Sequence, residues 1–198
     1  MKRIFMDIDT QVDFIHPQGA LYVPHAEKLQ EKYQEISLYA LDNEITVLAS
    51  ADAHPMEDPE FSQFPPHCLV NTSGQQKIRE TMPELFLVQK NDNLPVDAGD
   101  LSATNILFEK QEFNVFSNPK IDVYLQHLQP EQVIVYGVAS DYCVKAAVEG
   151  LLERGYSVEL LTDAIRAVNP ESEKTILEEF AGQSVVLSTF EEISSQSE

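Results

Sequence analysis

The sequence contains two cysteines, and Cys143 is the one placed for nucleophilic chemistry. It follows the apolar segment QVIVYGVA (132–139) and opens a segment with helical spacing, 141–153. Amide groups in the first turn of a helix can stabilise a thiolate, lower its pKa and hold an oxyanion. Asp141 is suited to cap this helix. A buried structural role for Cys143 is the alternative on position alone, because free cysteine is among the most buried residue types.

A cysteine nucleophile needs a general base, and a carboxylate can supply it. Asp9 ends the first apolar segment, KRIFMDID (2–9), and fits this role. An aspartate at a strand end more often satisfies backbone groups. Lys110 ends the apolar segment 104–110, and Lys90 ends a similar segment, so the residues alone leave the choice of lysine open.

The segment DAHPMEDPEFSQFPPH (52–67) concentrates residue types that bind metals. Asp52 and His54 are two positions apart, and His67 ends the segment. Three further carboxylates lie between them: Glu57, Asp58 and Glu60. Two histidines with carboxylates suit Zn²⁺, and also Mn²⁺ or Fe²⁺. An acidic loop with incidental histidines is the alternative interpretation.

The other cysteine, Cys68, begins a segment like the Cys-x₅-Arg loop of cysteine phosphatases, but Gly74 stands at the arginine position. That loop needs its arginine to bind phosphate, so this motif is excluded and Cys68 is interpreted as structural. No Walker loop, dinucleotide-binding glycine fingerprint or G-x-S-x-G motif is present.

The surrounding pattern alternates strands with helices, which predicts one domain, residues 1–198, with a parallel sheet covered on both faces. The segments predicted as strands are 2–9, 44–51, 132–139, 156–162 and 184–188, with further apolar runs at 84–90 and 104–110. The segments predicted as helices are 26–42, 141–153 and 171–181, with a short one at 75–81. We expect a long functional loop at 52–74 and a frayed tail at 191–198. Sites in such sheets form at the carboxyl ends of strands, where the polar residues named above lie.

Composition narrows the class of protein. The 198 residues carry a formal charge of −20, which disfavours nucleic acid and anionic membrane surfaces as partners. No apolar run reaches the roughly 20 residues that a membrane span needs, and no secretory signal pattern is present. Two cysteines do not make a disulfide framework. We therefore expect a cytoplasmic protein in a reducing compartment.

Taken together, the sequence resembles the isochorismatase-like cysteine hydrolase superfamily, and within it the nicotinamidases. The matching segments are DTQVDF (9–14), GALYV (19–23), ADAHP (51–55), FPPHCLVNTSG (64–74), EKQEFNVFS (109–117), GVASDYCVKAAVEG (137–150) and RGYSVELLTDAIRAV (154–168). They occur in the family's order and span nearly the whole chain. The resemblance implies a three-layer α/β/α fold with a six-stranded parallel sheet, and relatives often form homo-oligomers.

The resemblance also implies roles for individual residues. Asp9, Lys110 and Cys143 match the family's catalytic triad, and Lys110 is preferred to Lys90 because the aromatic-rich EFNVFS pattern follows it. A cis peptide at Val138–Ala139 is expected, with the amides of Ala139 and Cys143 forming an oxyanion hole. Phe14 and Phe64 are expected to contact the substrate. A divalent metal would be held by a set of four residues: Asp52, His54, Glu60 and His67. Asp58 competes with Glu60 for the carboxylate position.

The function implied is hydrolysis of a small planar amide, nicotinamide to nicotinate and ammonia, through a cysteine thioester. The first alternative is a metal-independent cysteine hydrolase of the same superfamily acting on a carbamoyl, ureido or isochorismate-like substrate. The second is a non-catalytic binding protein that keeps the fold, which the presence of all three triad residues argues against.

Overall fold

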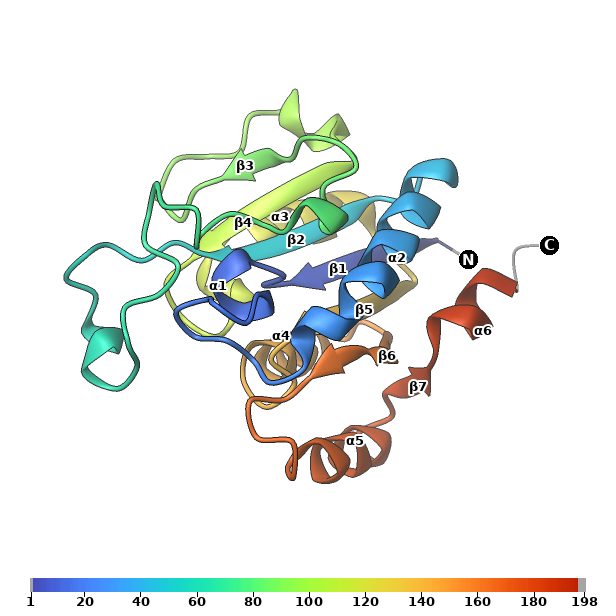
Figure 1. The fold of residues 1–198 in the computed structure, drawn as a ribbon. Helices are drawn as coiled ribbons and strands as arrows, with labels where there is room; N and C mark the ends of the chain where they lie inside the picture. The colour runs from blue at the N-terminus through green and yellow to red at the C-terminus, as the bar shows by residue number, and fades with distance from the viewer. Residues whose placement is uncertain (1, 196–198) are drawn as a thin grey trace.

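The computed structural model describes residues 2–195, which form one seven-stranded parallel sheet in the order β3-β4-β2-β1-β5-β6-β7 (Figure 1). The strands are β1 (Arg3–Ile8), β2 (Val47–Asp52), β3 (Leu87–Gln89), β4 (Asn105–Lys110), β5 (Gln132–Val138), β6 (Val158–Arg166) and β7 (Val186–Ser188). The predicted α/β fold with a parallel sheet is confirmed. The sheet has one strand more than expected, because short strands at both edges, β3 and β7, pair with their neighbours.

Helices cover both faces of this sheet. They are α1 (Val12–Ile15), α2 (Gln30–Asp42), α3 (Lys120–Leu128), α4 (Cys143–Glu153), α5 (Glu173–Gly182) and α6 (Phe190–Ser194). Helices α3, α4 and α5 share one hydrophobic core, and α1, α2 and α6 share the other. Within residues 2–195, no helix is both long and apolar enough to cross a bilayer.

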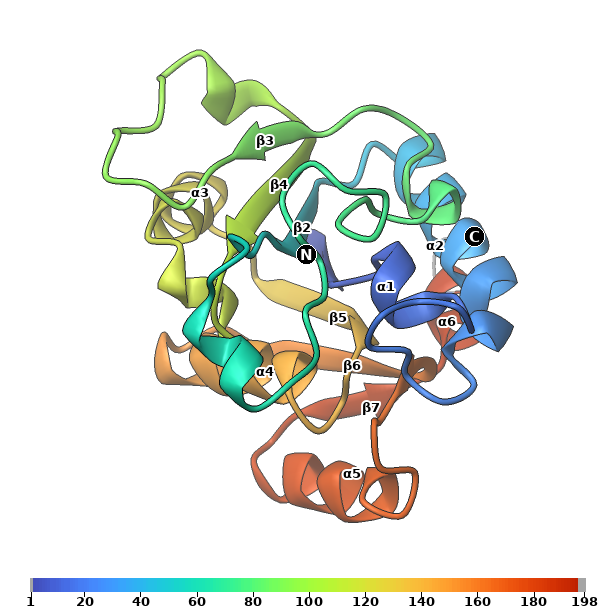
Figure 2. The ribbon, with the colours of Figure 1, turned by 60° about the vertical axis from the view of Figure 1, so that its left-hand side comes forward.

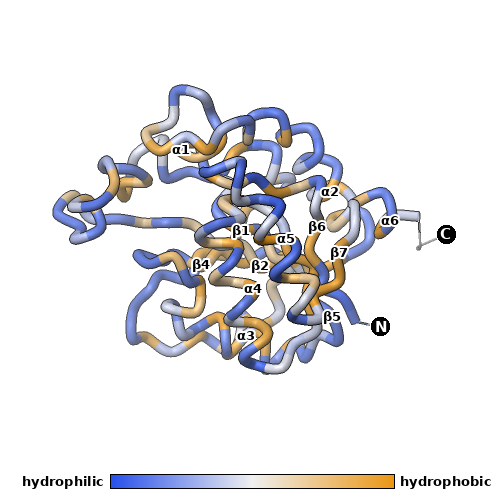
Figure 3. The backbone as a smooth tube through the Cα atoms, turned by 90° about the horizontal axis from the view of Figure 1, so that it is seen from below, coloured by the Kyte–Doolittle hydropathy of each residue, from blue (hydrophilic) through white to orange (hydrophobic). Residues whose placement is uncertain are grey.

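The side chains of β1 enter both hydrophobic cores. Ile4, Met6 and Ile8 point into the core under α3–α5, whereas Phe5 points into the core under α2. This alternation follows from the two-residue period of a strand, and apolar residues lie on both sides because both faces of a parallel sheet are buried. Asp7, on the same side as Phe5, is the buried exception. Figure 3 shows the result, with hydrophobic residues on the central strands and hydrophilic ones on the outer loops.

The chain enters the sheet in the middle and builds outward in two directions, so the strand order reverses between β1 and β5. A reversal of this kind leaves a crevice at the carboxyl ends of the two strands. The residues after β1 and β5 therefore face each other there. The long connection from β2 to β3, residues 53–86, crosses the same edge (Figure 2).

Three local predictions are wrong or incomplete. Within 75–81 only a short 3₁₀ turn, Arg79–Thr81, forms, because the preceding backbone pairs with the segment after β1 through Val12 N–Gln76 O and Ile78 N–Thr10 O. Helix α3 has no counterpart among the helices expected from the sequence. The tail is ordered through Ser194, because Phe190 and Ile193 are buried and a capping box at Thr189 starts α6. The remaining tail residues, 196–198, lie outside the described part of the chain.

Gly137 provides a test of the packing between β1 and β5. Its φ is +122°, and a Cβ at this position would lie 2.0 Å from the Ile8 carbonyl oxygen. We expect Gly137→Ala to lower the free energy of unfolding by at least about 3 kcal/mol, because strain and a backbone clash add. Urea unfolding monitored by circular dichroism measures this loss.

The matched control is Gly182→Ala at the end of α5. A Cβ there meets nothing within 4 Å, so we expect a neutral or slightly stabilising effect. Equal stabilities of the two variants would contradict the interpretation.

Candidate active site

The three residues of the predicted triad meet at the β1/β5 crevice. The Lys110 Nζ lies 2.8 Å from Asp9 Oδ2 and 3.6 Å from Cys143 Sγ, and it also contacts Asp52 Oδ1 at 2.5 Å. All four side chains are buried. The structure thus places one cation among two carboxylates and a thiol, and their burial strengthens the electrostatic interactions between them.

The sheet sets these positions. Asp9 follows β1 with φ +49°, and Cys143 is the first residue of α4, after β5 and a short turn. Lys110 ends β4 directly beside Asp52, because these two residues are paired across β2 and β4. Lys90 lies just after the edge strand β3 and is exposed, which decides between the two lysines in favour of Lys110.

Burial and charge act on these groups in opposite directions. Burial tends to lower the pKa of Lys110, but the Asp52 and Asp9 carboxylates outweigh it and hold the pKa well above its usual value. Burial also tends to raise the pKa of Asp52, but Lys110 outweighs it and the pKa falls. The lysine is therefore charged at neutral pH.

The expectation of a lowered thiol pKa at Cys143 is wrong for this structure. Burial raises the pKa of Cys143 well above its usual value, and Lys110 only partly offsets that effect. The helix start does not compensate for the loss of water around a thiolate. The resting thiol is neutral and needs a base to remove its proton.

The turn between β5 and α4 has the predicted cis peptide at Val138–Ala139. Its neighbouring amides are engaged: Ser140 N–H donates to Arg166 O, and Tyr142 and Val144 N–H donate to Ala139 O. These three amides are therefore unavailable to an oxyanion. The predicted oxyanion hole uses two other amides, those of Ala139 and Cys143.

Asp141 does not cap α4 as expected. Its Oδ1 accepts from Val168 N–H at 2.8 Å and its Oδ2 from Asn169 N–H at 2.9 Å. The carboxylate is therefore occupied in fastening the loop after β6 to the turn that carries Cys143.

The predicted metal ligands converge beside the triad. The His54 Nε2 lies 3.7 Å and the His67 Nε2 3.9 Å from Asp52 Oδ2, and His67 Nε2 lies 3.7 Å from Glu60 Oε1. Ligand atoms around a tetrahedral Zn²⁺ are separated by roughly 3.3–3.5 Å, so this cluster is close to the required spacing. The buried His54 Nε2 has no hydrogen-bond partner within the described residues, as expected of an atom reserved for a metal. The set fits a divalent cation.

The two competing carboxylates, Asp58 and Glu60, differ in their position relative to the metal cluster. Asp58 Oδ2 lies 3.0 Å from His54 Nδ1, on the side of the ring away from the cluster. A carboxylate on the far nitrogen fixes the orientation of a metal-binding histidine. Asp58 therefore orients His54, and Glu60 faces the cluster itself.

Gln11, in the segment between β1 and α1, supports the same cluster. Its side chain accepts from Asp52 N–H at 2.8 Å and donates to Asp52 O at 2.9 Å, so it holds the backbone of Asp52 at both ends. This clamp fixes a residue that serves both the triad and the metal cluster.

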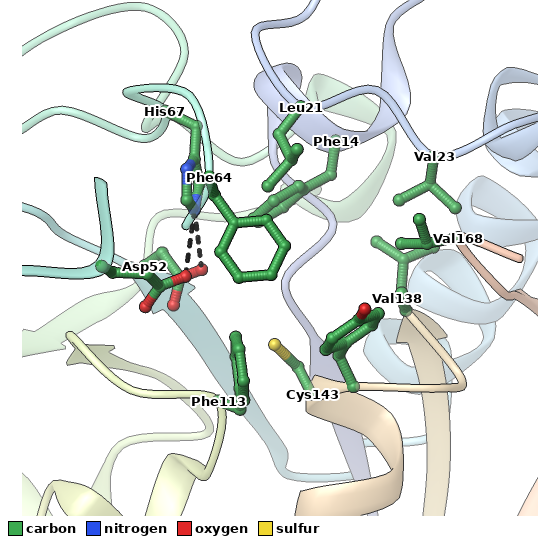
Figure 4. A pocket seen from close by; sticks show the side chains of 13 residues that line it. Phe14, Leu21, Val23, Asp52, Phe64, His67, Phe113, Val138, Cys143 and Val168 are labelled. Atoms are coloured by element: carbon green, nitrogen blue, oxygen red, sulfur yellow. Dashed lines mark ion pairs between the residues drawn. The ribbon is translucent and has the colours of Figure 1, made fainter. Parts of the chain in front are cut away.

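A small cavity of about 50 Å³ opens above the thiol (Figure 4). Phe14 and Phe64 line it, as predicted from the resemblance. Figure 4 shows Cys143 pointing its sulfur into the cavity, with His67 and Asp52 together at one side. Sequence reasoning did not assign the remaining apolar walls: Leu21, Val23, Phe113, Tyr142 and Val168. All five belong to segments that match the family. Their place in those segments is the signal that could have identified them.

Asp13 is a second residue whose role the sequence did not reveal. Its Oδ2 accepts from Cys68 N–H at 2.7 Å and its Oδ1 from Ala20 N–H at 3.1 Å. A Cβ at Gly74 would lie 2.1 Å from this carboxylate, so the close approach requires glycine there. Asp13 thereby holds both the loop that carries His67 and the loop that carries Leu21 against the cavity.

Comparison with known proteins agrees with this geometry. The model of the isochorismatase domain family matches residues 4–192. The chain is 26% identical to a nicotinamidase from Saccharomyces cerevisiae, over 87% of this chain and 91% of the relative. It is 27% identical to a nicotinamidase from Escherichia coli, over 84% of each. A pyrazinamidase from Pyrococcus horikoshii solved in complex with zinc superposes with a TM-score of 0.79 at 25% identity, covering 96% of this chain and all of the other.

The fold and the buried Asp–Lys–Cys cluster define a cysteine-dependent amidohydrolase. The chain belongs to the isochorismatase family, because the family match covers nearly its whole length. The zinc complex of the Pyrococcus horikoshii pyrazinamidase and the Asp52–His54–His67 cluster of this chain further indicate a divalent metal.

Metal uptake should depend on pH through His54. Burial works against protonation, but the nearby carboxylates of Asp52 and Asp58 outweigh it and raise the pKa of His54 to about 9. A histidine must lose its extra proton and become neutral before it can bind a metal. Below pH 9 the metal must therefore displace a proton, and we expect release of about one proton per Zn²⁺ at pH 7. Affinity should fall roughly tenfold for each pH unit below that.

Isothermal titration calorimetry in buffers with different ionisation enthalpies measures the proton count. His54→Ala serves as the control, since it should bind more weakly and release fewer protons. Uptake at pH 7 without proton release from the parent protein would refute the assignment.

Proposed function

We propose that this enzyme hydrolyses the carboxamide of nicotinamide to nicotinate and ammonia, with Cys143 as nucleophile. The observation that carries the proposal is the cavity above Cys143. Its walls are apolar and aromatic, its floor is the thiol, and the metal cluster lies at one side. The names of the two curated relatives given above support the same substrate.

The cavity favours a neutral planar ring. Phe14, Phe64 and Phe113 present aromatic surfaces, and ring faces and edges are good contacts for another aromatic ring. None of the residues that line the cavity is lysine or arginine, whereas Asp52 and Glu60 are acidic. A substrate with a carboxylate would therefore lose its hydration without gaining a counter-ion.

The reaction follows from the triad geometry. Asp9 removes the thiol proton, and the Cys143 sulfur attacks the amide carbon. The amides of Ala139 and Cys143 stabilise the oxyanion. Lys110 stays charged and stabilises the anionic partners on either side of the proton transfer.

Three proton movements complete the cycle. Asp9 returns its proton to the leaving amine, and the carbon–nitrogen bond breaks to give ammonia and a thioester on Cys143. Asp9 then accepts a proton from water as that water attacks the thioester. The carbon–sulfur bond breaks to release the acid, and Asp9 returns the proton to the Cys143 sulfur, which restores the thiol.

The metal, for which Zn²⁺ is the first choice and Mn²⁺ or Fe²⁺ are alternatives, would be held by Asp52, His54, Glu60 and His67. When bound, it supplies a Lewis acid that can hold the ring nitrogen of the substrate. The cluster adjoins the cavity through Asp52, Glu60 and His67, which all line it. A ring held at this side of the cavity would present its amide to Cys143.

The alternative substrates are carbamoyl or ureido compounds and isochorismate-like molecules. Those that carry carboxylates need a counter-ion, and none of the residues that line the cavity is lysine or arginine. A metal-independent hydrolase would also leave the Asp52–His54–His67 cluster without a role. These features favour the nicotinamide reaction over the metal-independent one.

Ammonia release from nicotinamide tests the proposed reaction. We expect turnover by the metal-loaded enzyme, loss of most activity after chelation, and a decrease of at least about 10³-fold in Cys143→Ala, because the nucleophile is gone. Cys68→Ala is the matched control and should retain turnover, since its sulfur is a buried structural group. Full activity in Cys143→Ala would refute the mechanism.

The charge of the substrate tests the shape and polarity of the cavity. We expect kcat/KM for nicotinamide to exceed that for an anionic ureido acid by at least about 10²-fold, since an unpaired buried carboxylate costs several kcal/mol. Steady-state ammonia assays with both compounds measure the ratio. Similar values for the two would show that the cavity does not select against anions.

A further inference from the structure

A second buried ion pair lies next to the triad and takes no part in the reaction as described. Lys77 Nζ contacts Asp7 Oδ1 at 3.0 Å, and both side chains are almost fully buried. Thr10 Oγ1 donates to Asp7 at 2.9 Å. A buried ion pair is costly to form and is weak evidence for a purely stabilising role. Its location therefore calls for an explanation.

Lys77 makes a further contact that leads to the triad. Its Nζ donates to the backbone carbonyl of Ser50 at 3.2 Å. Ser50 belongs to β2, and its hydroxyl donates to Asp9 Oδ1 at 2.6 Å. The route from the second ion pair to the general base thus passes through one serine, with every group on it buried.

The two oxygens of Asp9 are used differently. Oδ1 accepts the Ser50 hydrogen bond, whose length is typical of a hydroxyl on a carboxylate. Oδ2 lies 2.8 Å from Lys110 Nζ, and among the described residues it accepts no hydrogen bond of good geometry. Oδ2 therefore retains a lone pair for the thiol proton, while Oδ1 serves as an anchor.

We propose that Ser50 is a positioning residue for Asp9, and that the buried Asp7–Lys77 pair holds Ser50 in place for that task. The Ser50 hydroxyl fixes the rotation of the Asp9 carboxylate, so that Oδ2 faces Lys110 and Cys143. Lys77 fixes the strand from which the hydroxyl is presented. This inference rests on the proposed role of Asp9 as base but not on the identity of the amide substrate.

Misplacement of a catalytic group by about an ångström can cost roughly 10²-fold in rate, because the productive geometry is then rarely populated. Ser50→Ala removes only the anchor and leaves the substrate cavity intact, since Ser50 does not line it. We expect kcat to fall by at least tenfold, with KM changed by less than twofold. Ser50→Thr keeps the hydroxyl and should recover most of kcat.

A second readout is independent of the substrate. The rate at which iodoacetamide alkylates Cys143, measured by peptide mass spectrometry at one pH, reports how readily the thiol loses its proton. We expect this rate to fall several-fold in Ser50→Ala and in Asp9→Asn. If the parent enzyme hydrolyses no nicotinamide while alkylation still depends on Ser50, the proposed substrate fails and this inference stands.

Ser37→Ala is the matched control. Ser37 is also a buried serine, and it interacts with Tyr136 on the α2 side of the sheet. It should change neither kcat nor the alkylation rate, although it removes a buried hydroxyl in the same way. Parent-like kcat and alkylation in Ser50→Ala would overturn the proposal, and so would a loss that Ser50→Thr fails to restore.

The second ion pair is tested by replacing both partners, because a single replacement leaves an unpaired buried charge. Asp7→Leu with Lys77→Met keeps similar volumes and should still fold, as circular dichroism and a thermal melt can establish. We expect kcat and the alkylation rate to fall at least threefold with KM little changed. A folded double variant with parent-like values would overturn the role given to Asp7 and Lys77.

Discussion

The charged ammonium group of Lys110 is the interaction on which the rest of the site depends. Asp9 and Asp52 are both buried, and burying two neighbouring carboxylates is costly unless a cation pairs with them. Lys110 contacts both of them and the thiol of Cys143. In the proposed reaction, the same ammonium group also stabilises the negative charge that shifts between Asp9 and Cys143 when the proton is transferred.

Asp52 joins this charge cluster to the metal cluster. One of its oxygens contacts Lys110, and the other faces His54 and His67. A single carboxylate therefore contacts both clusters, so a displacement of Asp52 would alter both. The surrounding clamps keep it in place: Gln11 holds the Asp52 backbone, and Asp58 orients His54. In the proposed reaction, catalysis and substrate orientation therefore share one framework at the end of β2.

Much of this arrangement could be predicted from the sequence. The apolar segments gave the strands β1, β2, β5 and β6 and the helices α2, α4 and α5, because burial on both sides of a parallel sheet requires long apolar runs. Residue types indicated the acid, the thiol and the metal ligands. Residue type and spacing left the choice between Lys110 and Lys90 open, and the resemblance to the family favoured Lys110. The resemblance likewise favoured Glu60, with Asp58 as its competitor. The physical reason for each choice lies in which strands are neighbours and which way side chains point, and local spacing contains neither kind of information.

By itself, the sequence determined the chemistry available and the layers of the fold, since residue type and apolar period are local properties. Only the tertiary structure decided how that chemistry is arranged. Burial raises the pKa of the Cys143 thiol where the helix start alone predicted a decrease. Asp141 fastens a loop where a helix cap was expected, and Lys77 comes from a segment without regular structure to pair with Asp7 beneath Asp9. Each outcome depends on contacts between residues far apart in the chain, and their desolvation and pairing exist only once the sheet has formed.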